Sequence, residues 1–266
     1  MWRRVLDLLL ATRTPLVFLD FETTGLSGAP PVEYAALVWA PWMPEELDEL
    51  SVKARSAAPP GLWMASSSRL NPSRASEPAA LRTHGITAEM VKGAPRYNAP
   101  EQVAFWAALA TGVDVLADPV NYELPAIFAG HNIAEADLAW MRRWGYLAPT
   151  YEPPMIDTRR MQVRFADRDG MPMPPAPDAH GAQDGPWQRP HAPGVFCPAV
   201  SHGLRPYASN LEGLTTALYG EPAPGGHGAL VDAVTSALCL WAMLELWAPC
   251  FRGTTTGEDP HAALAA

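Results

Sequence analysis

Apolar residues along the chain follow first a strand-like and later a helix-like pattern. Residues 16–20 form a continuous apolar run that ends in an aspartate, which is typical of a buried central strand whose end opens at a site. Residues 32–39 predict a second strand, and residues 50–55 indicate a third. Residues 59–78 are rich in Ser, Pro and Ala and predict a loop. We therefore expect the chain to begin as a meander of strands.

Later residues predict short strands that alternate with helices. The expected strands cover residues 127–129 and 155–157, and the expected helices cover residues 79–83, 87–92, 98–110, 134–144, 209–219 and 228–247. The last of these helices is almost wholly apolar and must be buried. This order of elements favours an α/β fold.

One domain with a long insertion is the expected organisation. Residues 165–207 are dense in Pro, Gly, His and Asp and show neither a helical nor a strand period, which predicts an insertion or mobile loop. Four side chains of this insertion could be imagined as a zinc site, but their spacings match no standard finger: His180, His191, Cys197 and His202. Residues 1–250 are assigned to one domain, and residues 251–266 to a disordered tail.

Charge and cysteine content narrow the function and the compartment. The formal net charge is -9, which argues against a broad basic surface for nucleic acid and favours local, metal-assisted contact. The three cysteines, Cys197, Cys239 and Cys250, form no C-x-x-C pair and favour a reducing compartment. Residues 5–11 are apolar but too short for a membrane span. We expect a cytoplasmic protein without a membrane segment.

Asp20 and Glu22 are the first candidates for a metal site. They lie two residues apart on a strand and project from the same face, so two acids come close together. Like charges at that distance repel unless a cation lies between them, and carboxylate oxygens suit Mg²⁺ or Mn²⁺ rather than zinc. An ordinary solvent-facing pair of acids at a strand end would show the same pattern.

Asp137 and Asp232 stand out because each interrupts an apolar helix. At about 100° per residue, Asp137 falls on the apolar stripe that includes Met141, where a carboxylate is costly unless it is paired or binds metal. His227 precedes Asp232 by five residues in a glycine-rich approach, from which an imidazole could reach a metal-bound water. The alternatives are an arginine partner for Asp137 and a merely exposed histidine.

Taken together, these residues resemble the DEDDh 3′-to-5′ exonucleases of the RNase H-like fold. Three blocks carry the resemblance: V-F-L-D-F-E-T-T-G-L at residues 17–26, A-G-H-N-I-A-E-A-D at residues 129–137 and H-G-A-L-V-D at residues 227–232. Two further segments are similar to the family, H-G-I-T-A-E-M-V at residues 84–91 and I-D-T at residues 156–158. The second block departs at Ala136, where many members carry an aromatic residue, and the insertion at 165–207 is long for the family.

The resemblance implies a fold, a reaction and a set of site residues. The fold would be a mixed sheet of about five strands with helices on both faces. Two Mg²⁺ or Mn²⁺ ions would be held by Asp20, Glu22, Asp137 and Asp232, with His227 as the general base. The 3′ nucleotide would contact four further residues, and a fifth would shape the site: Thr23, Leu26, His84, Ile86 and Asn132. Core packing is the alternative for Leu26 and Ile86.

The sequence constrains the substrate and the partners less than it constrains the reaction. The expected reaction is release of nucleoside monophosphates from the 3′ end of nucleic acid, single-stranded DNA being favoured over RNA. An exoribonuclease is the alternative, because the matched blocks act on the phosphodiester and do not read the 2′-hydroxyl. An inactive binding or scaffold domain is the remaining alternative. A polymerase or another nucleic-acid-processing complex would have to be a separate chain, and the oligomeric state stays open.

Overall fold

A computed structural model describes residues 14–26, 29–39, 62–111, 126–161, 210–219 and 227–247 of the 266 residues. Within these ranges no helix is both long and apolar enough to cross a membrane. Several expectations fall on other parts of the chain and are not addressed by the structure: the third strand at 50–55, the insertion at 165–207, the tail at 251–266, and the thiols Cys197 and Cys250.

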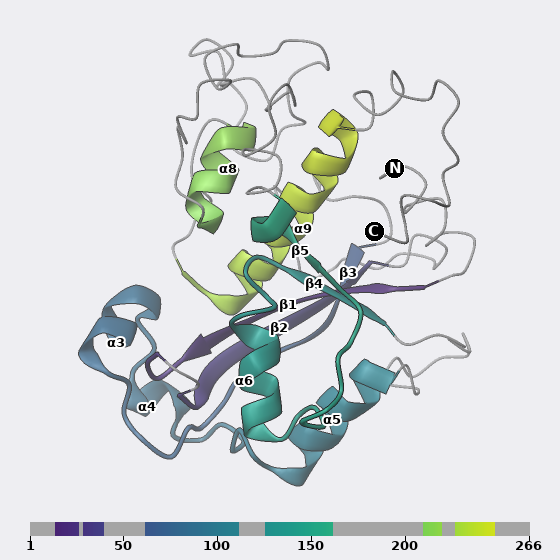
Figure 1. The fold of residues 1–266 in the computed structure, drawn as a ribbon. Coiled ribbons are helices and arrows are strands. Elements are labelled where there is room, and N and C mark those ends of the chain that lie inside the picture. The colour runs from purple at the N-terminus through teal and green to yellow at the C-terminus, as the bar shows by residue number, and fades with distance from the viewer. Residues whose placement is uncertain are drawn as a thin grey trace, which may run out of the picture.

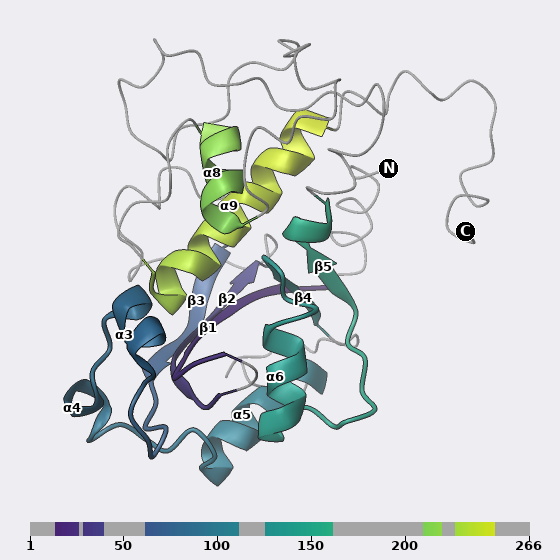
Figure 2. The ribbon, with the colours of Figure 1, turned by 60° about the vertical axis from the view of Figure 1, so that its left-hand side comes forward.

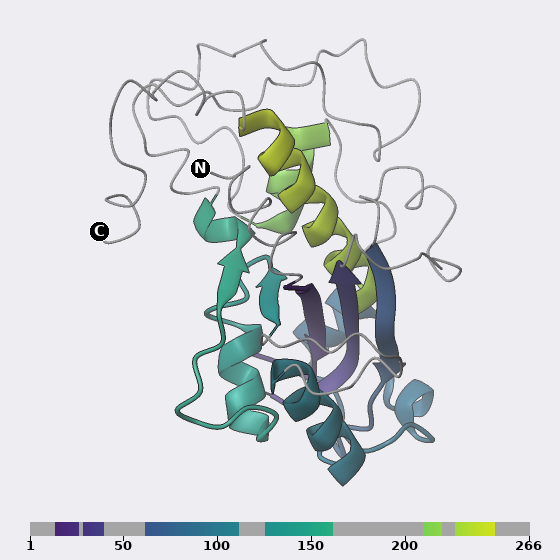
Figure 3. The ribbon, with the colours of Figure 1, turned by 90° about the vertical axis from the view of Figure 1, so that its right-hand side faces the viewer.

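The centre of the molecule is a mixed five-stranded sheet (Figure 1). Its strands are β1 (Leu16–Thr23), β2 (Pro31–Trp39), β3 (Leu62–Arg69), β4 (Ile127–Gly130) and β5 (Met155–Asp157), in the spatial order β3-β2-β1-β4-β5. The first three strands are antiparallel neighbours, whereas β4 runs parallel to β1 and β5 runs parallel to β4. Figure 3 shows the strands side by side. The carboxyl ends of β1, β4 and β5 therefore meet at one edge of the sheet.

Helices cover both faces of this sheet (Figure 2). They are α3 (Pro78–His84), α4 (Ala88–Val91), α5 (Pro100–Thr111), α6 (Asp137–Trp144), α8 (Leu211–Tyr219) and α9 (Ala229–Trp247). One core cluster joins α8 and α9 to one face, and a second joins α5 and α6 to the other. The expected α/β fold, a five-stranded mixed sheet with helices on both faces, is confirmed.

Side chains along β1 point alternately to the two faces of the sheet, so each faces one of the two helix layers. Leu16 and Phe18 pack in the cluster of α8 and α9, whereas Val17 and Leu19 pack in the cluster of α5 and α6. Because side chains on a strand alternate between faces, Asp20 continues the row of Leu16 and Phe18 on the α9 side. The strand thus carries its acids toward α9.

The third strand lies in a segment that the sequence pattern assigned to a loop. Residues 62–69 pair antiparallel with β2, although the whole of 59–78 was expected to be irregular. The outer half of β3 is rich in serine, and Ser66 is half-buried with its hydroxyl 2.8 Å from the hydroxyl of Tyr34. An edge strand needs only one paired side, so backbone hydrogen bonds to β2 outweigh the weak strand propensity of serine.

Helix α6 begins at Asp137, three residues later than the expected start at residue 134. Residues 131–136 form a series of turns, in which Asn132 adopts a left-handed conformation with φ of 64°. The main-chain N–H groups of Asn132 and Ala134 donate to the carboxylate of Asp157, at 3.1 and 3.2 Å. These tertiary bonds hold the segment out of the helix that its sequence favours.

Candidate active site

Three carboxylates from two elements converge at the edge of the sheet. Asp20 and Glu22 lie at the end of β1, and Asp232 lies in the first turn of α9. One carboxylate oxygen from each of them falls within 4.8 Å of the others. Glu22 is 9% exposed, and the side chain of Asp232 is 18% exposed. The group is therefore a largely buried cluster of oxygen ligands.

Small residues allow α9 to approach β1 closely. Ala229, Ala233 and Ala237 recur at helical spacing and are fully buried against the Leu16 and Phe18 face. At the start of the helix, Glu33 of β2 accepts the main-chain N–H of Ala229 at 3.0 Å. A carboxylate at this position satisfies one of the free N–H groups at a helix start and is favoured by the helix dipole.

The cluster carries more negative charge than its buried position favours. Burial raises the pKa of Asp20 well above its usual value, and the carboxylates of Asp137, Asp232 and Glu22 raise it further. Burial, with a contribution from Asp232, raises the pKa of Glu22 to about 7. Burial also raises the pKa of Asp232 to about 6, against the opposing effect of His227. These shifts are expected where carboxylates are gathered around the place of a cation.

The donor set suits a hard divalent cation. Carboxylate oxygens are the ligands preferred by Mg²⁺ and Mn²⁺, whereas zinc sites favour nitrogen and sulfur. The residues at the edge of the sheet thus fit the ion that the sequence predicted, and Asp20, Glu22 and Asp232 are those that could hold it.

Asp137 lies beside this cluster as the first residue of α6. It is 4% exposed, on the same helix face as the buried Met141. Burial raises its pKa to about 8, although hydrogen bonds with the main chain, including that of Phe21, lower it; the charges of Asp157 and Glu22 raise it further. Asp137 in turn raises the pKa of Asp20 more than any other charged neighbour does. Asp137 therefore contributes a fourth carboxylate to the electrostatics of this cluster.

His227 stands at the entrance to α9 and leaves much of its ring accessible. Its side chain is 58% exposed, and its Nδ1 lies 3.7 Å from Oδ2 of Asp232. A protonated imidazole would be stabilised by this carboxylate. The ring is thus placed beside the acids while remaining open to solvent or to a ligand.

The predicted substrate contacts divide into exposed and buried groups. Leu26, which follows β1, is 84% exposed. Ile86 is 4% exposed and packs with Val32 and Val91, as the alternative of core packing required. Asn132 directs its side-chain oxygen to Arg159, whose Nη1 donates to it at 2.6 Å. The role of each in substrate binding stays a prediction.

His84 holds the main chain that follows the first acids. Its Nδ1 accepts the N–H of Ile86 at 2.9 Å, and its Nε2 lies 3.2 Å from the main-chain oxygen of Thr23. Only a neutral ring protonated on Nε2 satisfies both bonds. Burial lowers the pKa of His84, which agrees with a neutral ring. The hydroxyl of Thr23 donates to Gly25 at 2.6 Å, so the turn after β1 is braced from both sides.

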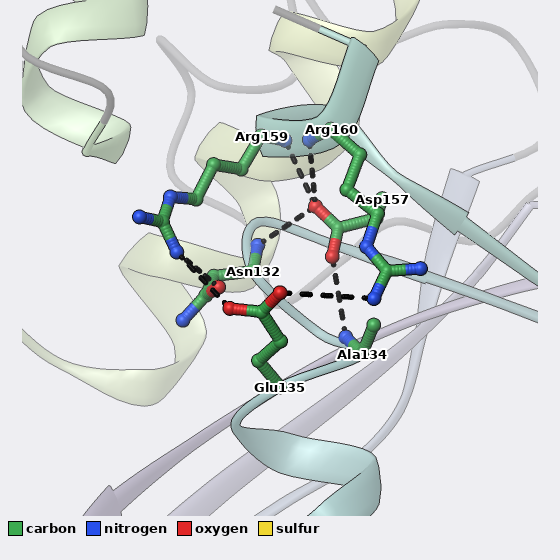
Figure 4. Close-up of polar contacts among 6 residues, drawn as sticks. All are labelled: Asn132, Ala134, Glu135, Asp157, Arg159 and Arg160. Carbon is green, nitrogen blue, oxygen red and sulfur yellow. Dashed lines mark hydrogen bonds and ion pairs between the residues drawn. The ribbon is translucent and has the colours of Figure 1, made fainter. Parts of the chain in front are cut away.

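The sequence interpretation gave no role in the site to two nearby carboxylates, although one of them, Asp157, belongs to the I-D-T segment that resembles the family. Glu33 faces Glu22 across the β1–β2 ladder and binds the start of α9. Asp157 ends β5 and accepts main-chain N–H groups of the loop before α6 (Figure 4). Their position along the chain could have identified them. An acid that ends a core strand, or that lies on a strand paired with β1, comes close to Asp20 and Glu22 when it is at the same edge of the sheet.

The sheet and its helices form an RNase H-like α/β fold, and a cluster of carboxylates lies at one edge of the sheet. No protein-family model and no curated protein sequence matches the chain. Solved structures of exonuclease I do share its fold: an Escherichia coli enzyme bound to a dT13 oligonucleotide matches with a TM-score of 0.55 at 16% identity, covering 95% of this chain and 46% of that one. A product-bound exonuclease I matches with a TM-score of 0.55 at 16% identity, covering 95% and 48%.

An apo exonuclease I gives the same result, with a TM-score of 0.55 at 15% identity over 95% of this chain and 47% of that one. The present chain thus spans slightly less than half of the length of these exonucleases. At such low identity the likeness establishes the fold.

Proposed function

We propose that the protein is a metal-dependent 3′-to-5′ exonuclease that releases nucleoside monophosphates by hydrolysing the terminal phosphodiester. The observation that carries this proposal is the approach of Asp20, Glu22 and Asp232 to within 4.8 Å at the edge of the sheet. The fold of exonuclease I supports it, and so does the DEDDh-like order of the blocks that contain these acids. The proposal assigns residues 1–250 to one exonuclease domain.

Two ions per site are part of the proposal. Asp20, Glu22 and Asp232 would hold one, and Asp20 would share a second with Asp137. Bound Mg²⁺ or Mn²⁺ supplies Lewis-acid stabilisation of the charge that develops on the phosphate during in-line displacement. The raised pKa of Asp137, about 8, belongs to the ion-free site, and a bound cation would favour its charged form.

His227 is proposed as the general base. Its exposed ring can take the proton from the attacking water, and the carboxylate of Asp232, 3.7 Å away, would stabilise the imidazolium that results. The neutral ring of His84 would keep the main chain of Thr23 in place for the terminal nucleotide. Leu26, 84% exposed, would offer an apolar contact to that nucleotide.

Single-stranded DNA is the proposed substrate. A solved exonuclease I binds a dT13 oligonucleotide, and the net charge of -9 suits local contact at a 3′ end rather than coverage of a long duplex. A separate nucleic-acid-processing chain is the proposed partner; one solved complex joins exonuclease I to SSB-Ct. The buried free thiol of Cys239 suits a reducing compartment, so we propose the cytoplasm.

The test is cleavage of labelled oligonucleotides. Single-stranded DNA, duplex DNA and RNA, each labelled at the 5′ end, are incubated with Mg²⁺, with Mn²⁺ or with chelator. We expect metal-dependent shortening one nucleotide at a time from the 3′ end, fastest on single-stranded DNA, and faster cleavage of RNA would favour the exoribonuclease. Asp20→Asn should abolish shortening while leaving the circular dichroism spectrum unchanged.

A matched control is Glu101→Gln, which removes one exposed acid from α5. This variant should cleave like the parent. Equal activity of Asp20→Asn and the parent would contradict the proposed site, and binding without chelator-sensitive cleavage would favour the scaffold alternative.

A further inference from the structure

Asp157, the last residue of β5, is a buried carboxylate that binds only main-chain N–H groups among the bonds described for it. It is 6% exposed. Its Oδ1 accepts from the N–H of Asn132 at 3.1 Å, Arg159 at 2.9 Å and Arg160 at 3.2 Å, and its Oδ2 accepts from that of Ala134 at 3.2 Å (Figure 4). An ionised carboxylate offers about four acceptor positions. The bonds described for Asp157 thus use most of its acceptor positions on main-chain donors, three on Oδ1 and one on Oδ2.

These bonds determine the path of the loop between β4 and α6. Two of the four donors belong to residues 131–136, and the other two lie within the helical residues 158–161 that follow β5. Asn132 adopts a left-handed conformation with φ of 64°, which asparagine tolerates better than most residues other than glycine, and its main-chain N–H is fixed by Asp157 in that conformation. The loop ends at Asp137, the first residue of α6. Its path therefore sets where the carboxylate of Asp137 lies.

The remaining contacts of the loop are more exposed. Glu135, whose side chain is 63% exposed, lies 3.5 Å from the guanidinium of Arg159 and 3.7 Å from that of Arg160. Exposed ion pairs of this kind contribute little to the stability of a conformation. On the inner side, Nδ1 of His131 lies 3.0 Å from the hydroxyl of Thr158. The guanidinium of Arg159 also donates to the side-chain oxygen of Asn132, at 2.6 Å. Asp157 is the buried carboxylate that joins this loop to the end of β5 through main-chain donors on both sides.

We propose that Asp157 is a positioning residue, which ties the 131–136 loop to the end of β5 and thereby holds Asp137 beside Asp20 for the second metal ion. This inference rests on the proposed function. An asparagine at position 157 would present one oxygen instead of two and would turn an N–H₂ group toward main-chain donors. At least one buried N–H would lose its acceptor, and the loop would relax away from its place.

The test compares Asp157→Asn with Glu135→Gln, which removes one negative charge from the exposed side of the same loop. For parent and variants, Mn²⁺ binding is measured by electron paramagnetic resonance of the free ion, together with cleavage rate against Mn²⁺ concentration and thermal unfolding. Substitution of groups that orient a metal ligand typically weakens metal affinity by about 10- to 100-fold. We expect Asp157→Asn to weaken the second Mn²⁺ by that factor and to recover kcat at high Mn²⁺.

The KM for the oligonucleotide should change far less than the Mn²⁺ requirement, since the partners described for Asp157 are main-chain groups of the protein itself. Glu135→Gln should bind Mn²⁺ and cleave like the parent. A purely structural role would lower the unfolding temperature without changing the Mn²⁺ requirement of the folded protein. A folded Asp157→Asn with the Mn²⁺ dependence of the parent overturns the proposal.

Asp157→Glu serves as the second variant if the asparagine prevents folding. It retains the charge but displaces both oxygens by one methylene, so the same rise in Mn²⁺ requirement is expected, and a parental value overturns the proposal. The two proposals fail in different ways. A parent that binds two Mn²⁺ ions without cleaving DNA contradicts the exonuclease, and the Mn²⁺ binding of the variants still decides the role of Asp157. A parent that binds no Mn²⁺ overturns both.

Discussion

Replacing Glu22 by Gln in the metal-free protein should stabilise the fold at alkaline pH. Glu22 is 9% exposed and has a pKa of about 7, compared with an ordinary value of 4.5. Because the folded state holds this proton more tightly than the unfolded state, the free energy of unfolding falls as pH rises from 4.5 through 7. The penalty is complete above pH 7 and absent below pH 4.5.

The size of the effect follows from the two pKa values. A difference of 2.5, from 4.5 to about 7, multiplied by about 1.36 kcal/mol gives roughly 3 kcal/mol above pH 7. Glutamine carries no charge at any of these pH values, so it avoids this penalty. With a urea m-value of about 1–3 kcal/mol/M, the unfolding midpoint at pH 8 should rise by roughly 1 M or more.

The assay is urea unfolding followed by tryptophan fluorescence in chelator, at pH 5 and at pH 8. Trp106, fully buried among aromatic neighbours, provides a reporter inside the core. Glu101→Gln is the control, because an exposed acid should give no such gain. If Glu22 binds the ion as proposed, added Mn²⁺ should make the parent more stable to urea than Glu22→Gln at pH 8. A metal-free Glu22→Gln protein that is no more stable than the parent at pH 8 would refute the electrostatic argument.

Three further outcomes follow from the same site. On the proposed mechanism, Asp137→Asn should reduce cleavage at least about 100-fold in a gel assay, because several kcal/mol of transition-state stabilisation would depend on the ions. Retained cleavage would remove Asp137 from the proposed site. His227→Gln should lower kcat by about 100- to 10,000-fold while Mn²⁺ binding stays parental, and loss of Mn²⁺ binding would contradict its role as a base. Gly130→Ala should destabilise the protein by about 1–3 kcal/mol in urea unfolding. The added Cβ would lie 3.2 Å from both the Cβ of Ile133 and the main-chain oxygen of Leu19. An unchanged unfolding midpoint would show that these neighbours move aside at little cost.

The central strands were predictable because burial on both faces leaves a continuous apolar run. Residues 16–20 and 32–39 show such runs, and both are strands in the structure. The edge strand β3 was not predicted because its serine-rich residues show no alternation of apolar and polar positions. Backbone pairing with β2 holds them in a strand. The start of α6 was predicted too early because residues 134–136 are compatible with a helix. In the structure, the carboxylate of Asp157, more than twenty residues later, accepts hydrogen bonds from the main-chain N–H groups of this loop.

The candidate site was predictable to the extent that its acids violate local patterns. Asp137 and Asp232 interrupt apolar helix faces, which marks them without any knowledge of the fold, whereas Asp20 and Glu22 look ordinary until the other acids are considered. The structure brings Asp20, Glu22 and Asp232 together, and their catalytic roles stay predictions. Asp157 could not have been given its role from sequence, because its partners are main-chain groups that every residue carries.

The two additional carboxylates explain how so much negative charge is held at one edge of the sheet. Repulsion among Asp20, Glu22, Asp137 and Asp232 pushes apart the elements that carry them. Glu33 ties the start of α9 to β2 through the N–H of Ala229, and Asp157 ties the loop before α6 to β5. Each carboxylate thereby restrains one element of the site, although its charge still raises the pKa of a neighbouring acid: Glu33 raises that of Glu22, and Asp157 raises that of Asp137. A site restrained in this way would be formed before a cation arrives, so binding would need little rearrangement and the proposed cation would relieve the repulsion.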